Sequence, residues 1–275
     1  PLYHLASTGQ ITLRVLTPDP MGILQPHTLQ SAIGPRTALV VLCHASNVTG
    51  VIQPISRLGA ICQENGVPLL VDAAQTAGVL DVSLHALNAD MIAMPGHKGL
   101  LGPHGVGLLA LRRGVCPEPL IRGGTGSVSE SMEQPESLPD RYESGTLPLP
   151  NIAGLLLGIR FVRAHLAEIR EYEDALNRRL REGLEHIPGI RCLGHPDAPR
   201  VGITSFVPRR MDGGALSDSL DQAGFALRGG LHCAPAMHTW LGTLRSGALR
   251  ASVGIYNTEE EVDALVALVE RFVQE

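Results

Sequence analysis

The chain has 275 residues, which at roughly 150 residues per domain is enough for two domains and a full apolar core. It carries 22 Lys and Arg against 27 Asp and Glu, a formal net charge of -5, and only 3% aromatic residues. Surfaces that bind nucleic acid or anionic membranes need clustered positive charge, and single-stranded nucleic acid also needs aromatic side chains for stacking. We therefore expect a globular protein that binds neither nucleic acid nor a membrane.

The sequence also carries no recognisable signal for export or metal binding. No apolar run reaches the roughly 20 residues of a membrane helix, and the first residues do not follow the pattern of a signal peptide. The five cysteines are an odd number in a chain without an export signal, which indicates a reducing cytoplasm, and they include no CxxC pair that would indicate a zinc or dithiol site. Four of them lie in apolar or unremarkable sequence and are expected to be buried: Cys43, Cys62, Cys116 and Cys192.

Strand-like and helix-like segments alternate in the first part of the chain. Short apolar runs with β-branched residues predict strands that are buried on both faces, and apolar positions at helical spacing predict helices between them. Because this alternation is typical of parallel sheets, we expect an α/β fold, a mainly parallel sheet with flanking helices. The predicted strands are 37–42, 67–71, 90–94 and 106–111, and the predicted helices are 54–65 and 82–87.

The composition changes in the middle of the chain. Residues 123–150 are rich in Gly, Ser, Glu and Pro and predict a long loop. A long helix is expected over 152–184, with an interruption near 165–167. The first part of the chain, 1–160, is therefore expected to be a large domain that ends within this helix.

The remainder, 161–275, predicts a smaller C-terminal α+β domain. A strand is expected at 201–207, and helices at 214–223 and 259–273. Thr258 is followed by three glutamates, which is typical of an N-cap with acidic residues in the first helical turn.

Two polar side chains follow neighbouring predicted strands. Asp72 comes directly after the run 67–71, and Lys98 comes just after the next strand, between Gly96 and Gly99. In a parallel sheet the carboxyl ends of the strands meet at one edge, where ligands bind. A pyridoxal phosphate site needs such a pair, because the lysine forms a Schiff base with the cofactor and the carboxylate keeps the ring nitrogen protonated. A plain salt bridge explains the spacing equally well, so the spacing leaves both interpretations open.

A series of short motifs along the whole chain favours the first interpretation. The motifs are HASNVTG at 44–50, DAAQ at 72–75, GHK at 96–98, RGGTG at 122–126, RYESGT at 141–146, RGGLHCAP at 228–235, RAS at 250–252 and YNT at 256–258. With these motifs in this order, the chain resembles the pyridoxal-phosphate-dependent class V aminotransferase and cysteine desulfurase family. The resemblance implies the fold-type I transferase architecture, with pyridoxal 5'-phosphate bound by the large domain.

The resemblance implies a set of cofactor ligands. Lys98 corresponds to the Schiff-base lysine and Asp72 to the partner of the pyridine nitrogen. Gln75 corresponds to the donor to the phenolic oxygen, and His97 to a phosphate ligand. Thr146 corresponds to the residue that reaches the phosphate in the other subunit, which implies a homodimer with shared sites; an ordinary loop threonine is the alternative.

The resemblance also implies how substrate is held and attacked. Asn47 and Arg250 correspond to the clamp on the substrate carboxylate, a group that suits a guanidinium fork. Arg228 is expected to assist, although an exposed salt bridge explains it equally well. Cys233 lies in a glycine-rich loop beside His232, where a thiolate is favoured. In the desulfurases such a loop cysteine takes the sulfur of L-cysteine as a persulfide and releases L-alanine, and a sulfur-acceptor protein then receives it.

Two departures from the family pattern accompany the resemblance. Pro95 stands where relatives commonly have a hydroxyl residue that binds the phosphate. The match begins within the family's large domain and residue 1 is Pro1, so we expect an N-terminally truncated chain that lacks a phosphate loop and a ring-stacking residue. Cysteine desulfurase is the leading expectation; a selenocysteine lyase, another class V lyase or aminotransferase, or an inactive fragment of such an enzyme are the alternatives.

Overall fold

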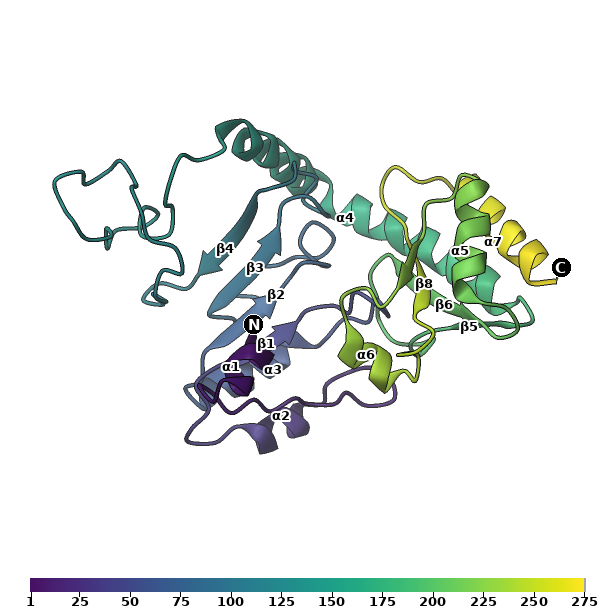
Figure 1. Cartoon of the computed structure of the whole chain (residues 1–275), viewed down its shortest axis with the longest axis horizontal. Helices are drawn as coiled ribbons and strands as arrows, with labels where there is room; N and C mark the ends of the chain where they lie inside the picture. Colours follow the sequence, from purple (N-terminus) through teal and green to yellow (C-terminus); the bar gives the residue numbers. More distant parts are fainter. Residues whose placement is uncertain (275) are drawn as a thin grey trace.

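The computed structural model of the chain describes residues 1–274 and contains two four-stranded sheets, joined by one long helix that crosses the upper part of Figure 1. The strands of the first sheet are β1 (Val40–Cys43), β2 (Leu69–Asp72), β3 (Met91–Pro95) and β4 (Gly107–Leu111). Those of the second sheet are β5 (Ile190–Cys192), β6 (Ile203–Pro208), β7 (Arg228–Gly230) and β8 (Ala248–Ser252). The helices are α1 (Leu2–Ser7), α2 (Pro26–Ala32), α3 (Ile55–Glu64), α4 (Leu149–Glu185), α5 (Gly213–Gln222), α6 (Pro235–Trp240) and α7 (Glu259–Gln274).

The first sheet has the strand order β1-β2-β3-β4. β1, β2 and β3 run parallel, which confirms the prediction of an α/β fold with a mainly parallel sheet. β4 is the exception, because it pairs antiparallel with β3. The chain reaches β4 through a tight return in which Gly96 N donates to Val106 O at 2.9 Å. A parallel return would need a longer crossover that passes over a face of the sheet.

The expectation that the strands are buried on both faces is wrong for β1, where Val41 is 38% exposed. In β2, Leu69 and Val71 are fully buried, and Leu70 on the other face is half-buried. The buried side chains pack into one core with residues of α2 and α3. Because side chains alternate along a strand, the remaining ones point to the opposite, more exposed face. The apolar runs therefore predicted the strands correctly and the burial of β1 incorrectly.

The helix predicted at 82–87 is also wrong. Residues 84–88 form hydrogen-bonded turns, in which Ala89 N donates to Leu84 O at 3.0 Å. Asn88 then adopts a left-handed conformation with φ of 52°. Turns and isolated bridges occupy residues 74–80 after β2, and the six residues predicted as a helix allow fewer than two helical turns, of which the first is costly to form alone. Leu87 nevertheless reaches the core, with 6% exposure.

The helix α4 passes from the first sheet to the second. Its one non-helical residue is His165, with φ of -124° and ψ of 16°, which lies within the predicted interruption. The first half of α4 packs closely on the turn that follows β3. A Cβ atom on Gly158 would lie only 2.3 Å from the carbonyl oxygen of Leu100, so this approach of the two backbones requires glycine.

The second sheet has the order β5-β6-β8-β7, and every neighbouring pair is antiparallel. The second half of α4, together with α5 and α7, shares one core with Phe206 of β6 and Leu249 of β8, at the right of Figure 1. At the start of α7, Glu261 N donates to Thr258 Oγ1 at 3.3 Å and Thr258 N donates to Glu261 Oε2 at 3.1 Å. This reciprocal pair is a capping box, and it confirms the predicted N-cap.

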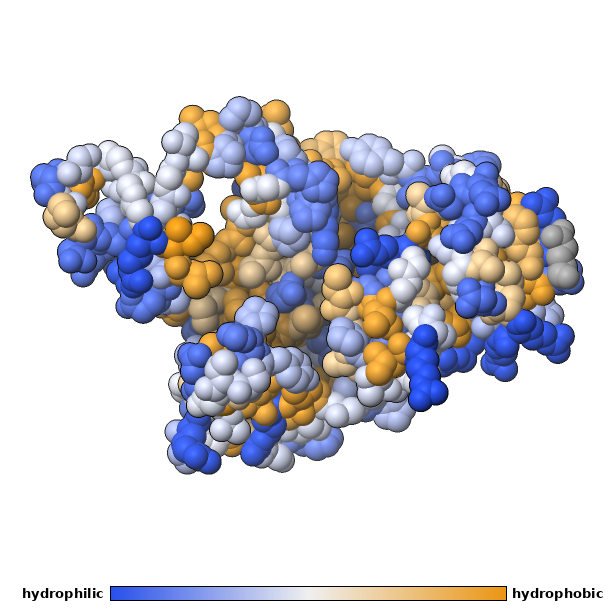
Figure 2. Space-filling view, viewed as in Figure 1, coloured by the Kyte–Doolittle hydropathy of each residue, from blue (hydrophilic) through white to orange (hydrophobic). Residues whose placement is uncertain are grey.

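Apolar side chains gather on one part of the surface. Figure 2 shows them between the long loop that precedes α4 and the body of the molecule. Within residues 1–274, no helix has the length and apolar character that crossing a membrane requires. The exposed apolar residues of the first sheet and the first half of α4 include Leu39, Val41, Leu108, Leu109, Leu156, Leu157 and Phe161.

Candidate active site

The carboxyl ends of β2 and β3 carry the first group of predicted site residues. Asp72 is the last residue of β2 and pairs in register with Ala93 of β3. Asp72 Oδ1 accepts a hydrogen bond from Ala74 N at 2.9 Å, which fixes the turn after the strand. Lys98 lies in the turn after β3, which is closed by Leu101 N donating to Lys98 O at 2.8 Å. The register of a parallel sheet thus brings Asp72 and Lys98 to the same edge.

The turns after β2 and β3 touch through their backbones. Gly78 has φ of +91°, and a Cβ atom there would lie 2.0 Å from the carbonyl oxygen of Gly99. A Cβ atom on Gly99 would in turn lie 2.6 Å from the carbonyl oxygen of Ala77. Side chains at either position would force the turns apart. These two glycines therefore hold the turn that contains Gln75 against the turn that contains Lys98.

The second sheet supplies the opposite wall. Arg228 of β7 lies directly opposite Arg250 of β8 in the antiparallel register. The chain leaves β7 in a turn in which His232 and Cys233 have φ of 51° and 59°. Left-handed conformations are unfavourable for residues other than glycine, so two in succession mark a constrained turn. Cys233 is exposed in this turn.

One cavity of about 680 Å³ joins the two walls. Seven of the nine predicted site residues line it: Asn47, Gln75, His97, Lys98, Arg228, Cys233 and Arg250. The sequence motifs that carry these residues are separated by up to about 200 positions, yet the fold brings them to one place. The cavity lies between the two sheets, where a small molecule can be held from both sides.

Lys98 is the only lysine among the 275 residues. Burial lowers the pKa of its amine below the usual value, and Arg250 acts in the same direction, whereas Asp72 and Cys233 oppose the shift. Among residues 1–274, the ion pairs do not include one between Asp72 and Lys98, so the plain salt bridge is not formed. An amine with a lowered pKa is more often uncharged and is therefore a better nucleophile toward an aldehyde.

Asn47 and Arg250, the two residues predicted to hold the substrate carboxylate, contact each other, and Asn47 also contacts the turn that contains Cys233. Arg250 Nη1 donates to Asn47 O at 3.0 Å. The side chain of Asn47 donates from Nδ2 to His232 O at 2.5 Å. Burial lowers the pKa of Arg250, with Arg228 acting in the same direction and Cys233 opposing it. Two guanidinium groups at one end of the cavity favour an anionic ligand there.

Thr146 is not brought to the cavity. It is exposed, near the end of the loop that connects β4 to α4, and this loop extends away from the body of the molecule in Figure 1. His97 lines the cavity, and its ring stacks on His104 with 4.8 Å between the ring centroids. Thr146 is therefore not among the predicted site residues of its own chain that line the cavity.

The other cysteines differ from expectation. Cys62 is fully buried, as predicted, and Cys192 is half-buried. The prediction of burial is wrong for Cys43 and Cys116, which are exposed. Cys43 ends β1 beside Asp72 in the parallel register, where its Sγ lies 4.0 Å from Asp72 Oδ2. Strand ends and loops place small residues at the surface even when the neighbouring sequence is apolar.

Sequence reasoning missed one ionisable residue of the cavity. Glu173 of α4 lines it and is only 8% exposed. Burial raises the pKa of its carboxyl group to about 7, Asp174 acts in the same direction, and Arg170 opposes the shift. A signal was present in the sequence, because Glu173 occupies an apolar position of the helix between Ile169 and Leu176.

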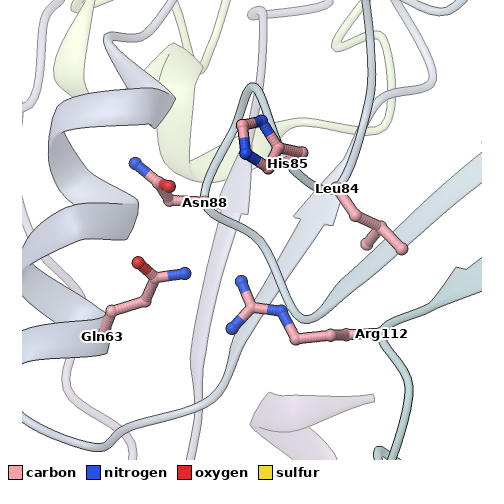
Figure 3. A pocket seen from close by; sticks show the side chains of 5 residues that line it. All are labelled: Gln63, Leu84, His85, Asn88 and Arg112. Atoms are coloured by element: carbon pink, nitrogen blue, oxygen red, sulfur yellow. The ribbon is translucent and has the colours of Figure 1, made fainter.

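A second cavity, of about 410 Å³, lies away from this site. Figure 3 shows the guanidinium group of Arg112 facing Gln63. Arg112 pairs with Asp90 at 3.2 Å and donates to Ala89 O at 3.1 Å, and it donates to the Gln63 amide oxygen at 2.6 Å when that amide is turned so that its oxygen faces the guanidinium group. The guanidinium group of Arg112 is therefore already bonded to other groups of the protein. The residues that line this cavity are Gln63, Leu84, His85, Asn88 and Arg112.

Comparison with known proteins gives matches along nearly the whole chain. The family model described as aminotransferase class-V matches residues 1–265. The chain is 36% identical over 272 residues to a probable cysteine desulfurase of Methanothermobacter thermautotrophicus, covering 96% of this chain and 68% of that relative. It is 36% identical over 261 residues to a cysteine desulfurase of Salmonella newport, covering 93% of this chain and 63% of the relative.

A solved structure gives the same picture of the fold. The apo structure of a cysteine desulfurase from Thermococcus onnurineus NA1 matches with a TM-score of 0.89 and 32% identity, covering 99% of this chain and 69% of that one. This likeness confirms the predicted fold class. The chain spans about two thirds of the length of these relatives.

Proposed function

The chain belongs to the aminotransferase class-V family. On that premise we propose that it removes sulfur from L-cysteine with the help of pyridoxal 5'-phosphate, giving L-alanine and a persulfide on Cys233. The observation that carries the proposal is the cavity that Lys98 and Cys233 line together, opposite one another on the two sheets. The names of the matched relatives support the same reaction.

The residues of the first wall fit pyridoxal 5'-phosphate. Lys98 offers the only side-chain amine of the chain, with its pKa lowered by burial. Asp72 offers a carboxylate for the ring nitrogen, while Gln75 and His97 offer donors for the phenolic oxygen and the phosphate. When bound, the cofactor acts as an electron sink that weakens bonds at the α and β carbons of an amino acid.

The residues of the second wall fit an amino-acid substrate. Arg250 and Asn47 would hold the carboxylate, with Arg228 beside them. The thiolate of Cys233 attacks the sulfur of the substrate, so that an S–S bond forms and the C–S bond breaks. The electron pair of the broken bond passes to the substrate β carbon, which gains a proton and becomes the methyl group of alanine. Cys233 retains the sulfur as a persulfide.

The exposure of Cys233 supports transfer of this sulfur to an acceptor protein, since a buried thiol could not pass it on. We further propose a homodimer in which Thr146 contacts the cofactor phosphate of the neighbouring subunit. Its position on an exposed loop, away from the cavity of its own chain, supports this assignment.

The test measures alanine and persulfide together. Protein loaded with pyridoxal 5'-phosphate is expected to release alanine from L-cysteine and to carry one extra sulfur on the peptide that contains Cys233. Cys233→Ser should bind cofactor normally and lose nearly all alanine release, because a hydroxyl group is a poor acceptor of sulfur. Cys116→Ser, which removes another exposed thiol, should behave as wild type. Full alanine release by Cys233→Ser would overturn the proposal.

A further inference from the structure

The turn that carries Cys233 depends on its surroundings for its shape. His232 and Cys233 are both left-handed, a conformation that persists in residues other than glycine only where neighbouring groups hold it. The ring of His232 is buried and lies against that of His238, with 5.5 Å between centroids. This contact fixes the side chain of His232. Ala234 N donates to Leu231 O at 2.8 Å and closes the turn, but this bond does not connect the backbone of the turn to the segment across from it.

A rigid segment lies directly across from this turn. The segment 46–50 is fixed to β6, because Ser205 Oγ donates to Val48 O at 2.5 Å in a buried position. A Cβ atom on Gly50 would lie 2.8 Å from the carbonyl oxygen of Ile203, so the two backbones pack without space between them. Val48 is fully buried. The segment therefore forms a firm base for any group that projects from it.

Asn47 projects from this base to the turn. Its Nδ2 donates to His232 O at 2.5 Å, and it links segments that are 185 residues apart. Arg250 Nη1 donates to the backbone carbonyl of Asn47 at 3.0 Å, which keeps Asn47 next to the carboxylate-binding arginine. A side-chain amide has two N–H groups. One can hold the turn while the other faces the cavity that Asn47 lines.

We propose that Asn47 is a positioning residue that holds the Cys233 turn through the His232 carbonyl. The role goes beyond that of a carboxylate ligand and rests on the proposed desulfurase function. Asn47 contacts the turn through its side-chain amide and Arg250 through its backbone carbonyl, so it positions the Cys233 turn relative to the carboxylate end of the cavity. Sulfur transfer requires the distance from the thiol to the bound substrate to be short while the S–S bond forms.

Amide hydrogen exchange in the turn tests the proposal without any need to measure enzyme turnover. In cofactor-loaded protein without substrate, Asn47→Asp and Asn47→Ala should speed amide exchange in residues 231–234 about five-fold, the effect of losing one hydrogen bond. Asn47→Gln, which keeps an N–H donor on a longer side chain, should recover part of the protection. The matched control is Asn88→Asp, since Asn88 Nδ2 also donates to a backbone carbonyl, Ser56 O at 3.0 Å; it should leave the turn unchanged.

Kinetics separate positioning from substrate binding. Loss of positioning lowers kcat for alanine release, whereas loss of a carboxylate ligand alone raises KM and leaves both kcat and exchange unchanged. Alkylation of Cys62, which is fully buried in the folded chain, reports unfolding in any variant. Unchanged exchange in folded Asn47→Asp and Asn47→Ala would overturn the proposal. Exchange needs no catalysis, so a chain that releases no alanine would overturn the proposed function while the exchange result still decides the role of Asn47.

Discussion

The two walls of the cavity differ in what holds them. The turn that contains Lys98 is fixed by backbone packing, since Gly78 and Gly99 allow two turns to touch. The turn that contains Cys233 follows β7, an edge strand, and one side-chain hydrogen bond, from Asn47 to the His232 carbonyl, joins it to the facing segment 46–50. Backbone packing leaves almost no room for movement, whereas a single side-chain hydrogen bond can open at small cost in free energy.

This difference matches the two tasks that we propose. A lysine that carries a cofactor stays in one place through the reaction. A cysteine that accepts sulfur inside the cavity and passes it to a partner gains from a turn that can open. We propose that the division of the chain into 1–160 and 161–275 follows the same line, with the break of α4 at His165 close to the boundary.

The largest expected effect is on the fixed wall, from Lys98→Ala. The variant has no lysine, so borohydride reduction should no longer attach cofactor to a side chain and turnover should be lost. Peptide mass mapping of the reduced protein measures the label. Arg209→Lys, which adds a lysine at an exposed position, should keep the label on Lys98 alone. Retained turnover in Lys98→Ala would show that the wall is not the cofactor site.

A smaller but still large effect is expected from Asp72→Asn. The amide can accept from Ala74 N as the carboxylate does, so the turn and cofactor binding should persist. The rate should fall by several orders of magnitude, because a neutral amide does not keep the ring nitrogen protonated. Cofactor absorbance monitors binding and alanine release monitors rate, with Asp81→Asn at an exposed position as the control. A near-normal rate would remove Asp72 from the proposed cofactor site.

The sequence predicted the fold where local patterns decide it. Apolar runs located β1 to β4, and the break of α4 was expected at the correct place. Burial of β1 on both faces and the helix at 82–87 were wrong, because each depends on what packs against the segment rather than on the segment itself. The antiparallel direction of β4 likewise follows from the tight return at Gly96, which no periodicity encodes.

The site residues were predicted from short sequence motifs, and the topology of the fold brings these motifs to one cavity. The contacts between residues of different motifs could not be predicted from the motifs themselves. The bond from Asn47 to the His232 carbonyl spans 185 residues and depends on how two sheets pack. Glu173 was missed because an acid in a helical apolar stripe resembles a surface residue until the partner sheet is known. The single lysine of the chain, with every other Lys or Arg position being arginine, was an available signal for Lys98.

Glu173 of α4 lines the cavity, and the pH dependence of the free energy of unfolding tests how far its carboxyl group is shielded from water. Burial raises the pKa of this carboxyl group from its usual 4.5 to about 7, with Asp174 acting in the same direction and Arg170 opposing it. Between these values the folded chain binds more protons than the unfolded chain, so stability falls as pH rises from 4.5 to 7. Above that window the loss reaches roughly 3 kcal/mol.

Glu173→Gln should abolish this pH dependence and raise the free energy of unfolding at pH 8 relative to wild type. Urea unfolding at pH 5 and pH 8 measures the difference. Glu171→Gln, at an exposed position two residues away, should follow the wild-type profile. A parallel pH profile for wild type and Glu173→Gln would show that the carboxyl group is ionised at little cost, and so that this part of the cavity is open to water.

The smallest expected effect is on the free energy of unfolding, and it comes from the capping box at the start of α7. Thr258→Ala removes the hydroxyl that accepts from Glu261 N, and with it one half of the capping box of α7. The expected loss is about 1 kcal/mol in the free energy of unfolding. Ser219→Ala, which removes a hydroxyl bonded within α5 to Ala215 O, is the matched control and should change stability little. Because α7 packs on α4 and α5 rather than on the cavity, cofactor attachment to Lys98 should stay normal in the Thr258 variant. A loss of cofactor binding would show that the two walls are coupled through the helices of the second sheet, and that the fixed wall is less independent than its backbone packing indicates.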